Sequence, residues 1–433
     1  MPDEEKTLKT VAAPAAGKSP VEVQAQHGPA LGKTFSALRG RNYRLFFAGQ
    51  LISLIGTWMQ IVAQAWLVYA LTNSPLYLGI VSFASSIPAL TLSLGAGVVI
   101  DRVPKRTLLI ITQCAEMLLA FVLAVDVMTG WVQAWHVVIL SFSLGIVDAF
   151  DVPARQAFVV EMVERREDLM NAIVLNSAIF NTARIIGPTL AGIALALVGA
   201  AWCFFLNGLS FIAVIIGLWL MDVKPMISAV RGVSPMTQMR EGLGYIWRNQ
   251  TVRTVISIVA VANLFGFGYS TLMPAFAEDV LNSGPAGLGF LSSAVGVGAL
   301  TGALLLASLG NFRHKGMLIT AGNLLFPIMA LFFSASKIFP LSAMILVGVG
   351  LGFMVQNVTA NTLIQVTVPD ELRGRVMSVY TMVFQGFFPV GSLLAGFIAQ
   401  NWGIPLGAAF GAGLSLLYSL FLLWHAPFLR KLA

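Results

Sequence analysis

The sequence predicts an all-α integral membrane protein whose twelve transmembrane helices form two pseudo-symmetric six-helix bundles. Three observations predict this fold: long uninterrupted apolar runs, basic residues confined to alternate joints between those runs, and two related halves. Of the 433 residues, 57% are hydrophobic and 10% are charged, whereas a soluble globular chain carries about 25% charged residues. The composition therefore excludes an ordinary soluble domain.

Twelve apolar runs are long enough to cross a membrane, because the ~30 Å hydrocarbon core requires about 20 residues of helix. A transmembrane β-barrel would show short segments of alternating polarity, and these runs are continuous. We expect the spans at roughly 45–70, 76–100, 107–127, 135–155, 172–198, 201–221, 252–277, 287–309, 316–336, 340–363, 376–399 and 404–425.

The basic residues predict the orientation of these helices. Of the 26 Lys and Arg residues, 24 lie in the terminal segments or on alternate joints, and only Arg184 and Lys337 do not. Positively charged joints remain on the cytoplasmic side of a membrane. We therefore expect a multi-pass protein of the inner or plasma membrane with both termini in the cytoplasm. The net charge of +7 is explained by basic residues at helix ends, which set the topology and face anionic lipid headgroups. We therefore expect no nucleic-acid partner.

The two halves of the chain are related in sequence. NSPLYLG at 73–79 matches SGPAGLG at 283–289, an offset of 210 residues. FNTARIIGPTLAG at 180–192 matches FQGFFPVGSLLAG at 384–396, an offset of 204 residues. Parallel six-helix repeats are an architecture of secondary transporters, in which two halves rock around a central site.

The repeat and the joints divide the chain into four parts. The first residues are rich in Ala, Pro, Lys, Glu and Gln, which is typical of a disordered segment. The longest joint contains MTQMREGLGYIWRN, which predicts a short amphipathic helix on the membrane surface. We expect a disordered cytoplasmic tail at 1–35, an N-terminal six-helix bundle at 36–221, a cytoplasmic linker at 222–250 and a C-terminal six-helix bundle at 251–433.

Polar side chains follow one face of the first predicted span, at spacings of three and four residues. They are Gln50, Ser53, Thr57, Gln60 and Gln64. Such a face must contact protein or a water-filled cavity. It either lines a cavity and binds substrate, or forms hydrogen bonds between helices that contribute roughly 0.6 kcal/mol each. For Gln60 and Gln64, which lie deepest in the span, we expect cavity lining.

Arg184 lies near the middle of the predicted span at 172–198, where a charge costs roughly 2.5–3.5 kcal/mol. Asn181 shares its helix face, and the repeat places Phe388 at the equivalent position of the second half. One interpretation is a structural pair with a buried carboxylate. The interpretation that we favour is a cation that meets an acidic substrate group, or that is released when a partner carboxylate takes up a proton. Asn181 and Arg184 are therefore candidates for the substrate cavity, and Arg184 also for proton coupling.

Three segments resemble the major facilitator superfamily. GVVIDRVPKR at 97–106 has the Gly-x-x-x-Asp-Arg-x-x-basic-basic pattern of its motif A. DVPARQAFVVEMVERREDLMNAIVLNS at 151–177 and LMPAFAEDVLNSGPAGLGFL at 272–291 resemble the branch that contains the enterobactin exporter. The resemblance extends from residue 36 to the end of the chain, and it implies the fold and the alternating access of that superfamily.

In that superfamily, motif A forms a charge network that bridges the two halves in the outward-open state. The resemblance implies such a cytoplasmic latch here, although charges that only set topology are the alternative. The latch residues would be Gly97, Asp101, Arg102, Lys105, Arg106, Asp151 and Arg155.

The segment Gly187-Pro188-Thr189-Leu190-Ala191-Gly192 resembles motif C of proton-coupled exporters. Ala191 replaces the first Gly of the final pair, a mild departure because both residues are small enough for close helix packing. We favour an exporter on this basis. A packing kink alone is the alternative explanation of Gly187, Pro188 and Gly192.

Two carboxylates within the predicted spans are candidates for proton coupling. Burial disfavours the charged form of a carboxyl group, which can then exchange a proton with water as the cavity changes sides. Asp148 is the first choice and Glu116 the second, because in this superfamily the fourth helix lines the cavity and the third is more peripheral. A latch between Asp148 and loop bases is the alternative. Drug antiporters carry a membrane-embedded Arg in the fourth helix, where this chain has Asp148 and Asp151, so their coupling scheme is in doubt here.

The sequence predicts a secondary active transporter that exports a small amphipathic molecule, such as a siderophore, a drug or another metabolite, by proton antiport. Asn263, Asn357 and Asn361 would complete its cavity. Uptake or lipid movement by the same fold is the alternative. A membrane enzyme is not expected, because no catalytic constellation is apparent, and a sensor would need an extra domain.

The sequence predicts neither a cofactor nor a metal site. It has no Gly-x-x-x-x-Gly-Lys-Ser/Thr loop for a nucleotide phosphate. His27, His136, His314 and His425 are too scattered to share a metal ion. The expected partners are a small-molecule substrate, protons and the lipid bilayer, and we expect a monomer.

Overall fold

The computed structural model describes residues 35–223, 235–310 and 313–432. The predicted disordered tail lies outside these residues except for Phe35, and so does part of the predicted linker, at 224–234. Within them, 12 segments are long and apolar enough to cross a membrane, and no strand is present. The predicted all-α membrane fold is confirmed.

Eleven of the spans are single helices. They are α2 (Arg41–Thr72), α3 (Pro75–Arg102), α4 (Lys105–Met128), α5 (Ala134–Met162), α6 (Leu169–Leu197), α7 (Ala200–Leu220), α12 (Gly284–Leu309), α13 (Lys315–Ala335), α14 (Phe339–Thr367), α15 (Asp370–Trp402) and α16 (Ile404–His425). A shorter helix, α8 (Pro235–Arg248), lies where the amphipathic segment was predicted.

The seventh span is the irregular one. It comprises α9 (Gln250–Val261), η3 (Ala262–Gly266), α10 (Gly268–Thr271), α11 (Met273–Ala275) and η4 (Phe276–Val280), of which η3 and η4 are π-helical. Pro274 lacks a backbone N–H, and helices bulge where the regular ladder is interrupted. The sequence predicted one uninterrupted helix here. A π-helical turn contains one extra residue, and hydrophobic periodicity does not reveal such an insertion.

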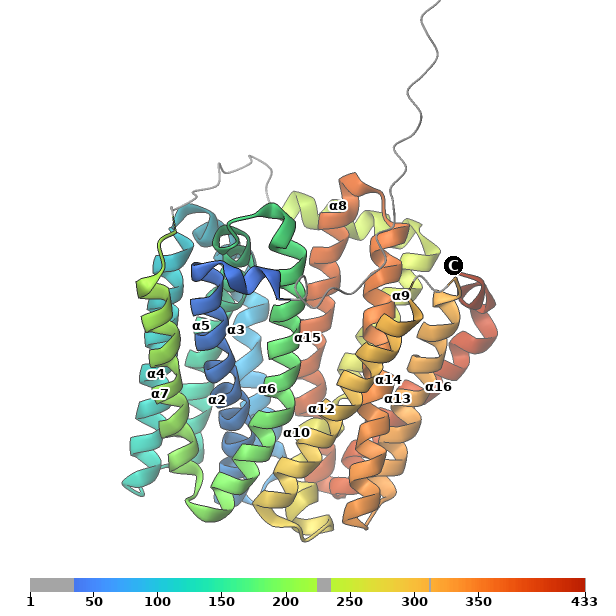
Figure 1. Cartoon of the computed structure of the whole chain (residues 1–433). Coiled ribbons are helices and arrows are strands. Elements are labelled where there is room, and N and C mark those ends of the chain that lie inside the picture. The colour runs from blue at the N-terminus through green and yellow to red at the C-terminus, as the bar shows by residue number, and fades with distance from the viewer. Residues whose placement is uncertain (1–34, 224–234, 311–312, 433) are drawn as a thin grey trace, which may run out of the picture.

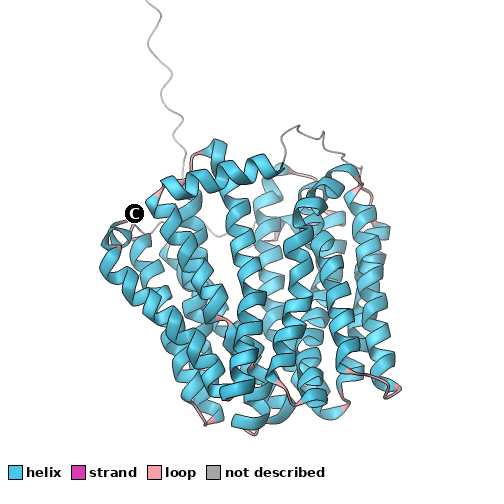
Figure 2. Cartoon of the chain, turned by 180° about the vertical axis from the view of Figure 1, so that it is seen from behind, coloured by secondary structure: helices cyan, strands magenta, loops and turns pink. Residues whose placement is uncertain are grey.

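The helices stand side by side, with α8 lying across one end (Figure 1). We call this the basic end, because it carries the joints α3–α4, α5–α6, α12–α13 and α14–α15 that hold the basic residues. The joints α2–α3, α4–α5, α6–α7, η4–α12, α13–α14 and α15–α16 lie at the other end, which we call the opposite end. Seen from behind, the spans are connected by short loops at the opposite end (Figure 2).

Helices α2–α7 pack against one another, as do the spans from α9 to α16. We refer to these two groups as the N-terminal and C-terminal halves. The main contacts between the halves are made by α3 with α15 and by α6 with α12.

Two pairs of glycines join the halves near the opposite end. A β-carbon on Gly192 of α6 would lie 3.0 Å from Cα of Gly289 on α12. A β-carbon on Gly396 of α15 would lie 3.3 Å from the backbone nitrogen of Gly79 on α3, and 2.6 Å from the carbonyl oxygen of Pro75. The sequence repeat relates Gly79 to Gly289 and Gly192 to Gly396, so the two crossings are equivalent. The helices approach here because glycine removes the side chain between them.

Hydrogen bonds also join the halves on this side. Tyr69 donates its hydroxyl proton to Asp279, and Ser74 donates to Gln400 Oε1 at 2.6 Å. Thr189 Oγ1 lies 2.7 Å from Ser293 Oγ. Toward the basic end, α15 instead exposes polar side chains, including Ser378 and Thr381. The two halves are therefore joined at the opposite end of the bundle.

Candidate functional site

Arg184 lies on α6 where the two halves meet. Its guanidinium carbon is 5.8 Å from the centroid of the Trp58 ring on α2, and it interacts electrostatically with Tyr269 of α10. Among the residues that the structure describes, no carboxylate forms an ion pair with Arg184. A cation over an aromatic face is stabilised by the ring quadrupole, but the guanidinium keeps donors available. Of the two interpretations of Arg184, the structural pair with a carboxylate is not found among the described residues.

Close packing of α6 positions this arginine. A β-carbon on Gly187 would lie 2.5 Å from Trp58 Cβ and 2.9 Å from the carbonyl oxygen of Ile55. Gly187 therefore lets α6 approach α2, which places the indole beside Arg184 one turn earlier. On the other side, Gly296 of α12 lies against the backbone of Arg184, with a hypothetical β-carbon 3.1 Å from its carbonyl oxygen. Small residues on both sides hold the arginine at the junction of the halves.

A second polar cluster lies between α4 and α5, within the N-terminal half. Asp151 is fully buried, and its Oδ1 accepts hydrogen bonds from Thr112 at 2.8 Å and from Gln113 at 3.0 Å. Gln113 also donates to Glu116 Oε2 at 3.1 Å. Arg155 pairs with Oδ2 of Asp151 at 3.1 Å, without the alignment of a hydrogen bond. We call these residues, together with Asp148, the carboxylate cluster.

The carboxylate cluster brings together both carboxylates that the sequence nominated for proton coupling. Glu116 interacts electrostatically with Asp148 and Asp151, and Asp148 interacts with Asp151 and Arg155. Oε1 of Glu116 is buried without a hydrogen-bond partner. The cluster thus holds three carboxyl groups and one guanidinium. Arg184, the third nominated residue, is not part of it.

The polar face of α2 makes hydrogen bonds within the N-terminal half. Gln60 is 7% exposed, and its Oε1 accepts a hydrogen bond from Asn207 Nδ2 of α7 at 2.8 Å. Gln64 donates to Ser141 Oγ of α5 at 2.8 Å. In this structure Gln60 meets α7 within the N-terminal half, and lining of the cavity by Gln60 and Gln64 stays a prediction. Gln64 is only half-buried.

The four asparagines nominated for the cavity lie in different settings. Asn181 is half-buried and donates to Ser177 O of its own helix at 2.9 Å, while Asn263 is buried in η3 and donates to Val259 O at 2.9 Å. On α14, Asn357 accepts from the Tyr380 hydroxyl at 2.6 Å, and Asn361 accepts from Gln365 at 2.5 Å. None of these four is hydrogen-bonded to Arg184 in the described part of the chain, and their place in a cavity stays a prediction.

Comparison with known proteins decides the family. The sequence profile of the family described as "Transmembrane secretion effector" matches residues 32–431. The chain belongs to this family of the major facilitator superfamily. It is 27% identical to the Staphyloferrin A transporter of Staphylococcus aureus (strain NCTC 8325 / PS 47), over 83% of the chain and 90% of that relative. It is also 27% identical to the multidrug efflux pump Tap of Mycolicibacterium fortuitum, over 84% of the chain and 91% of the relative.

Solved structures agree with the fold. A mutant of the nucleoside transporter NupG superposes with a TM-score of 0.72 at 11% identity, covering 88% of this chain and 99% of that one. A bacterial homologue of the lysosomal transporter Spinster, in an inward-facing and unoccupied conformation, has a TM-score of 0.64 at 13% identity, with 93% and 97% coverage. The family, the relatives and the 12 apolar spans of the described residues together show a multi-pass membrane transporter.

The motif A residues of this chain make contacts inside the N-terminal half. Lys105 Nζ pairs with Glu161 Oε1 at 2.7 Å, and Arg106 donates to the carbonyls of Leu218 and Trp219 at 2.7 Å. Cationic side chains at a helix C-terminus satisfy its last carbonyls. Asp101, Arg102 and Gly97 are exposed, and neither of the two charged side chains makes a polar contact within the described part of the chain. A bridge between the halves stays a prediction for another state of the transporter.

Several residues of these two sites were not nominated from the sequence. Trp58 and Tyr269 flank Arg184, and no spacing pattern identifies them, since each comes from a different helix. Thr112 and Gln113 donate hydrogen bonds within the carboxylate cluster. Both lie within one turn of Glu116 on the same apolar span, and this spacing could have identified them from the sequence. The motif C-like residues have a definite place: Gly187 packs on α2, while the Pro188 carbonyl and Gly192 lie against Gly289 of α12.

Proposed function

We propose that this transporter exports a small amphipathic molecule with an acidic group across the inner or plasma membrane, by proton-coupled alternating access. The observation that carries this proposal is Arg184. It lies at the junction of the two halves, beside the Trp58 ring, and no described carboxylate neutralises it. A charge is retained within a membrane span at a cost of roughly 2.5–3.5 kcal/mol, and binding an anionic substrate group offsets that cost.

Relatives support transport outward. Two of them are named efflux proteins: the multidrug efflux pump Tap and the macrolide efflux protein A of Streptococcus pyogenes, which is 23% identical over 84% of the chain and 91% of its own length. A third is named a transporter of staphyloferrin A. These names favour export of a metabolite or drug over uptake or lipid movement.

The carboxylate cluster supports proton coupling. Three carboxyl groups share one guanidinium between α4 and α5, and uncompensated negative charge is unfavourable in a buried site. We therefore expect the cluster to bind protons. Asp148 is half-buried whereas Asp151 and Glu116 are buried, so Asp148 remains the first candidate for exchange with water.

The contacts between the halves support alternating access. With the basic residues taken as cytoplasmic, the halves are joined on the outer side by the glycine pairs Gly192–Gly289 and Gly79–Gly396. Ser378 and Thr381 of α15 are exposed toward the inner side. We infer that this is the conformation open to the cytoplasm, in which an exporter loads its substrate.

Substrate binding can be tested with purified protein and a panel of compounds. Carboxylate siderophores, catecholate siderophores, macrolides and cationic dyes are compared by their effect on the unfolding temperature. We expect carboxylate-bearing compounds to stabilise the protein, Arg184→Gln to abolish the stabilisation, and Arg184→Lys to retain part of it. Stabilisation by cationic dyes alone, or an unchanged response of Arg184→Gln, would exclude the proposed site. Flux measured in inverted vesicles then separates export from uptake.

A further inference from the structure

A groove of about 630 Å³ lies on the surface of the N-terminal half, between the opposite-end parts of α4 and α5. Its apolar lining includes Phe121, Val125 and Ile139. Val125 and Ile139 are 56% and 53% exposed, yet both belong to membrane-spanning helices. The groove therefore opens toward lipid hydrocarbon, and its volume is in the range of about 300–1,000 Å³ that small ligands occupy.

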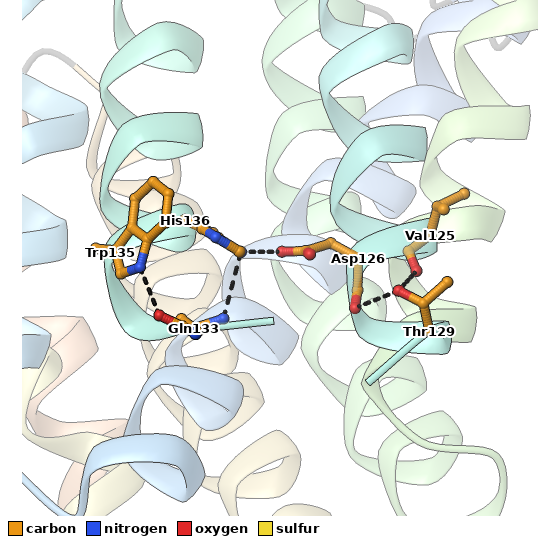
Figure 3. A network of polar contacts seen from close by, with 6 residues as sticks. All are labelled: Val125, Asp126, Thr129, Gln133, Trp135 and His136. Atoms are coloured by element: carbon orange, nitrogen blue, oxygen red, sulfur yellow. Dashed lines mark hydrogen bonds and ion pairs between the residues drawn. The ribbon is translucent and has the colours of Figure 1, made fainter. Parts of the chain in front are cut away.

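Asp126 and His136 line the groove and belong to a polar network, which Figure 3 shows. His136 Nδ1 lies 2.8 Å from Asp126 Oδ2, and the two side chains are 24% and 17% exposed. No Lys or Arg is among the residues that line the groove. Asp126 is the one carboxylate of the lining, and no permanently charged cation lies beside it there.

Two tryptophans stand at the same end. Trp131 is 79% exposed and Trp135 is 55% exposed. The indole N–H of Trp135 donates to Gln133 Oε1 at 2.6 Å, which orients the ring, and Figure 3 shows this bond beside His136. Tryptophans occupy the level of the lipid headgroups, and the face of an indole attracts an ammonium group. A carboxylate and indole faces above an apolar groove match an amphiphile with a cationic head.

We propose that this groove binds a membrane phospholipid with an ethanolamine headgroup, from the leaflet at the opposite end. The ammonium group binds at Asp126 and the tryptophans, and an acyl chain lies along Phe121, Val125 and Ile139. Lipid is the occupant because the groove opens toward the hydrocarbon of the bilayer. A glycerol headgroup is disfavoured, since its phosphate would meet Asp126 without an ammonium group between them. The site is separate from the proposed substrate site, because neither Trp58 nor Arg184 lines the groove.

Native mass spectrometry of the purified full-length protein tests this proposal. Phosphatidylethanolamine and phosphatidylglycerol with identical acyl chains are titrated separately, and the bound fraction is measured. We expect about tenfold tighter retention of phosphatidylethanolamine, as for one charge-assisted hydrogen bond. Asp126→Asn keeps an oxygen that can accept from His136, and it should bind the two lipids equally. Val125→Trp fills the groove and should weaken binding of both.

Glu278→Gln is the matched control, because Glu278 is an exposed carboxylate near the opposite end of the C-terminal half. It should keep the preference for phosphatidylethanolamine. Equal retention of the two lipids by the unmodified protein, an unchanged preference in Asp126→Asn, or unchanged binding in Val125→Trp would overturn the proposal. An equal loss in Glu278→Gln would show a general charge effect instead. Retention of dodecyltrimethylammonium without retention of phosphatidylethanolamine would assign the groove to a single-chain cation and reject the lipid.

Discussion

The hydroxyl group of Tyr69 donates a hydrogen bond to Asp279, which lies 210 residues later in the chain. The same offset relates Gly79 to Gly289. Tyr69 and Asp279 therefore occupy equivalent positions in the two halves, and the bond between them crosses the axis that relates the halves. It lies at the opposite end, where the glycine pairs also meet.

This bond should stabilise the state in which the opposite end is closed. A hydrogen bond contributes about 0.5–1.5 kcal/mol to the conformation that contains it, so Tyr69→Phe should shift the ratio of closed to open states by roughly 2- to 10-fold. The shift is measured as a change in the distance distribution between spin labels at Asn73→Cys and Asn282→Cys, with Cys114 and Cys203 replaced by Ala. Tyr77→Phe removes an exposed hydroxyl on α3 near the same end and serves as the control. Identical distributions for Tyr69→Phe and Tyr77→Phe would contradict a role for the bond.

Gly192→Leu should prevent closure of the opposite end. A single β-carbon at this position already lies 2.9 Å from the carbonyl oxygen of Ala286, so a longer side chain forces α6 away from α12. We expect the spin-label distance at the opposite end to increase and transport to be lost. Gly396→Leu, the equivalent substitution at the other crossing, should behave alike. Gly413→Leu is the control, since no atom lies within 4 Å of a β-carbon added there. Normal transport by Gly192→Leu would argue against a role for the α6–α12 crossing in closure.

The sequence predicted much of this fold because each of its signals is local or repeated. Apolar length identifies a span wherever it lies, and the repeat relates Gly192 to Gly396 without any knowledge of packing. The bond between Tyr69 and Asp279 was not predicted, although the repeat offset relates the two positions. A sequence repeat is recognised from similar residues at equivalent positions, and Tyr and Asp are not similar. The π-helical stretches of the seventh span were not predicted either. One extra residue in a helical turn does not change the apolar character of the run, so the sequence pattern carries no sign of it.

Which residues share a site depends on the rotation of each helix about its own axis, and the sequence does not give that rotation. A polar stripe shows that one face of α2 avoids lipid, but it cannot show whether that face meets a cavity or α7, and Gln60 meets Asn207 of α7. Asp148 and Glu116 were nominated separately, and only the packing of α4 on α5 brings them together with Asp151. Arg184 was identified because a charge within an apolar run is visible in the sequence, whereas Trp58 beside it was not.

Asp148→Asn should uncouple transport from the proton gradient. The amide cannot release or bind a proton, so efflux driven by a pH gradient in proteoliposomes should be lost, while exchange of substrate across the membrane without net proton movement continues. Glu116→Gln should have a smaller effect, because Glu116 is buried whereas Asp148 is half-buried. The control is Glu278→Gln, a change at an exposed carboxylate outside the carboxylate cluster. If Asp148→Asn retains gradient-driven efflux, the coupling role passes to Glu116 or Asp151.

Arg155→Gln should destabilise the protein through the carboxylate cluster. The side chains of Arg155 and Asp151 are 22% and 1% exposed, and their ion pair spans 3.1 Å. Removing one partner of a buried pair typically costs about 3–5 kcal/mol, because the other charge remains unpaired. We therefore expect a lower unfolding temperature in detergent, and a smaller loss at mildly acidic pH, where Glu116 or Asp148 can bind a proton and relieve the excess charge. Asp151→Asn in the same chain should restore much of the stability, since the amide still accepts from Thr112 and Gln113. A double variant as unstable as Arg155→Gln alone would mean that Arg155 acts through packing and not through the charge of Asp151.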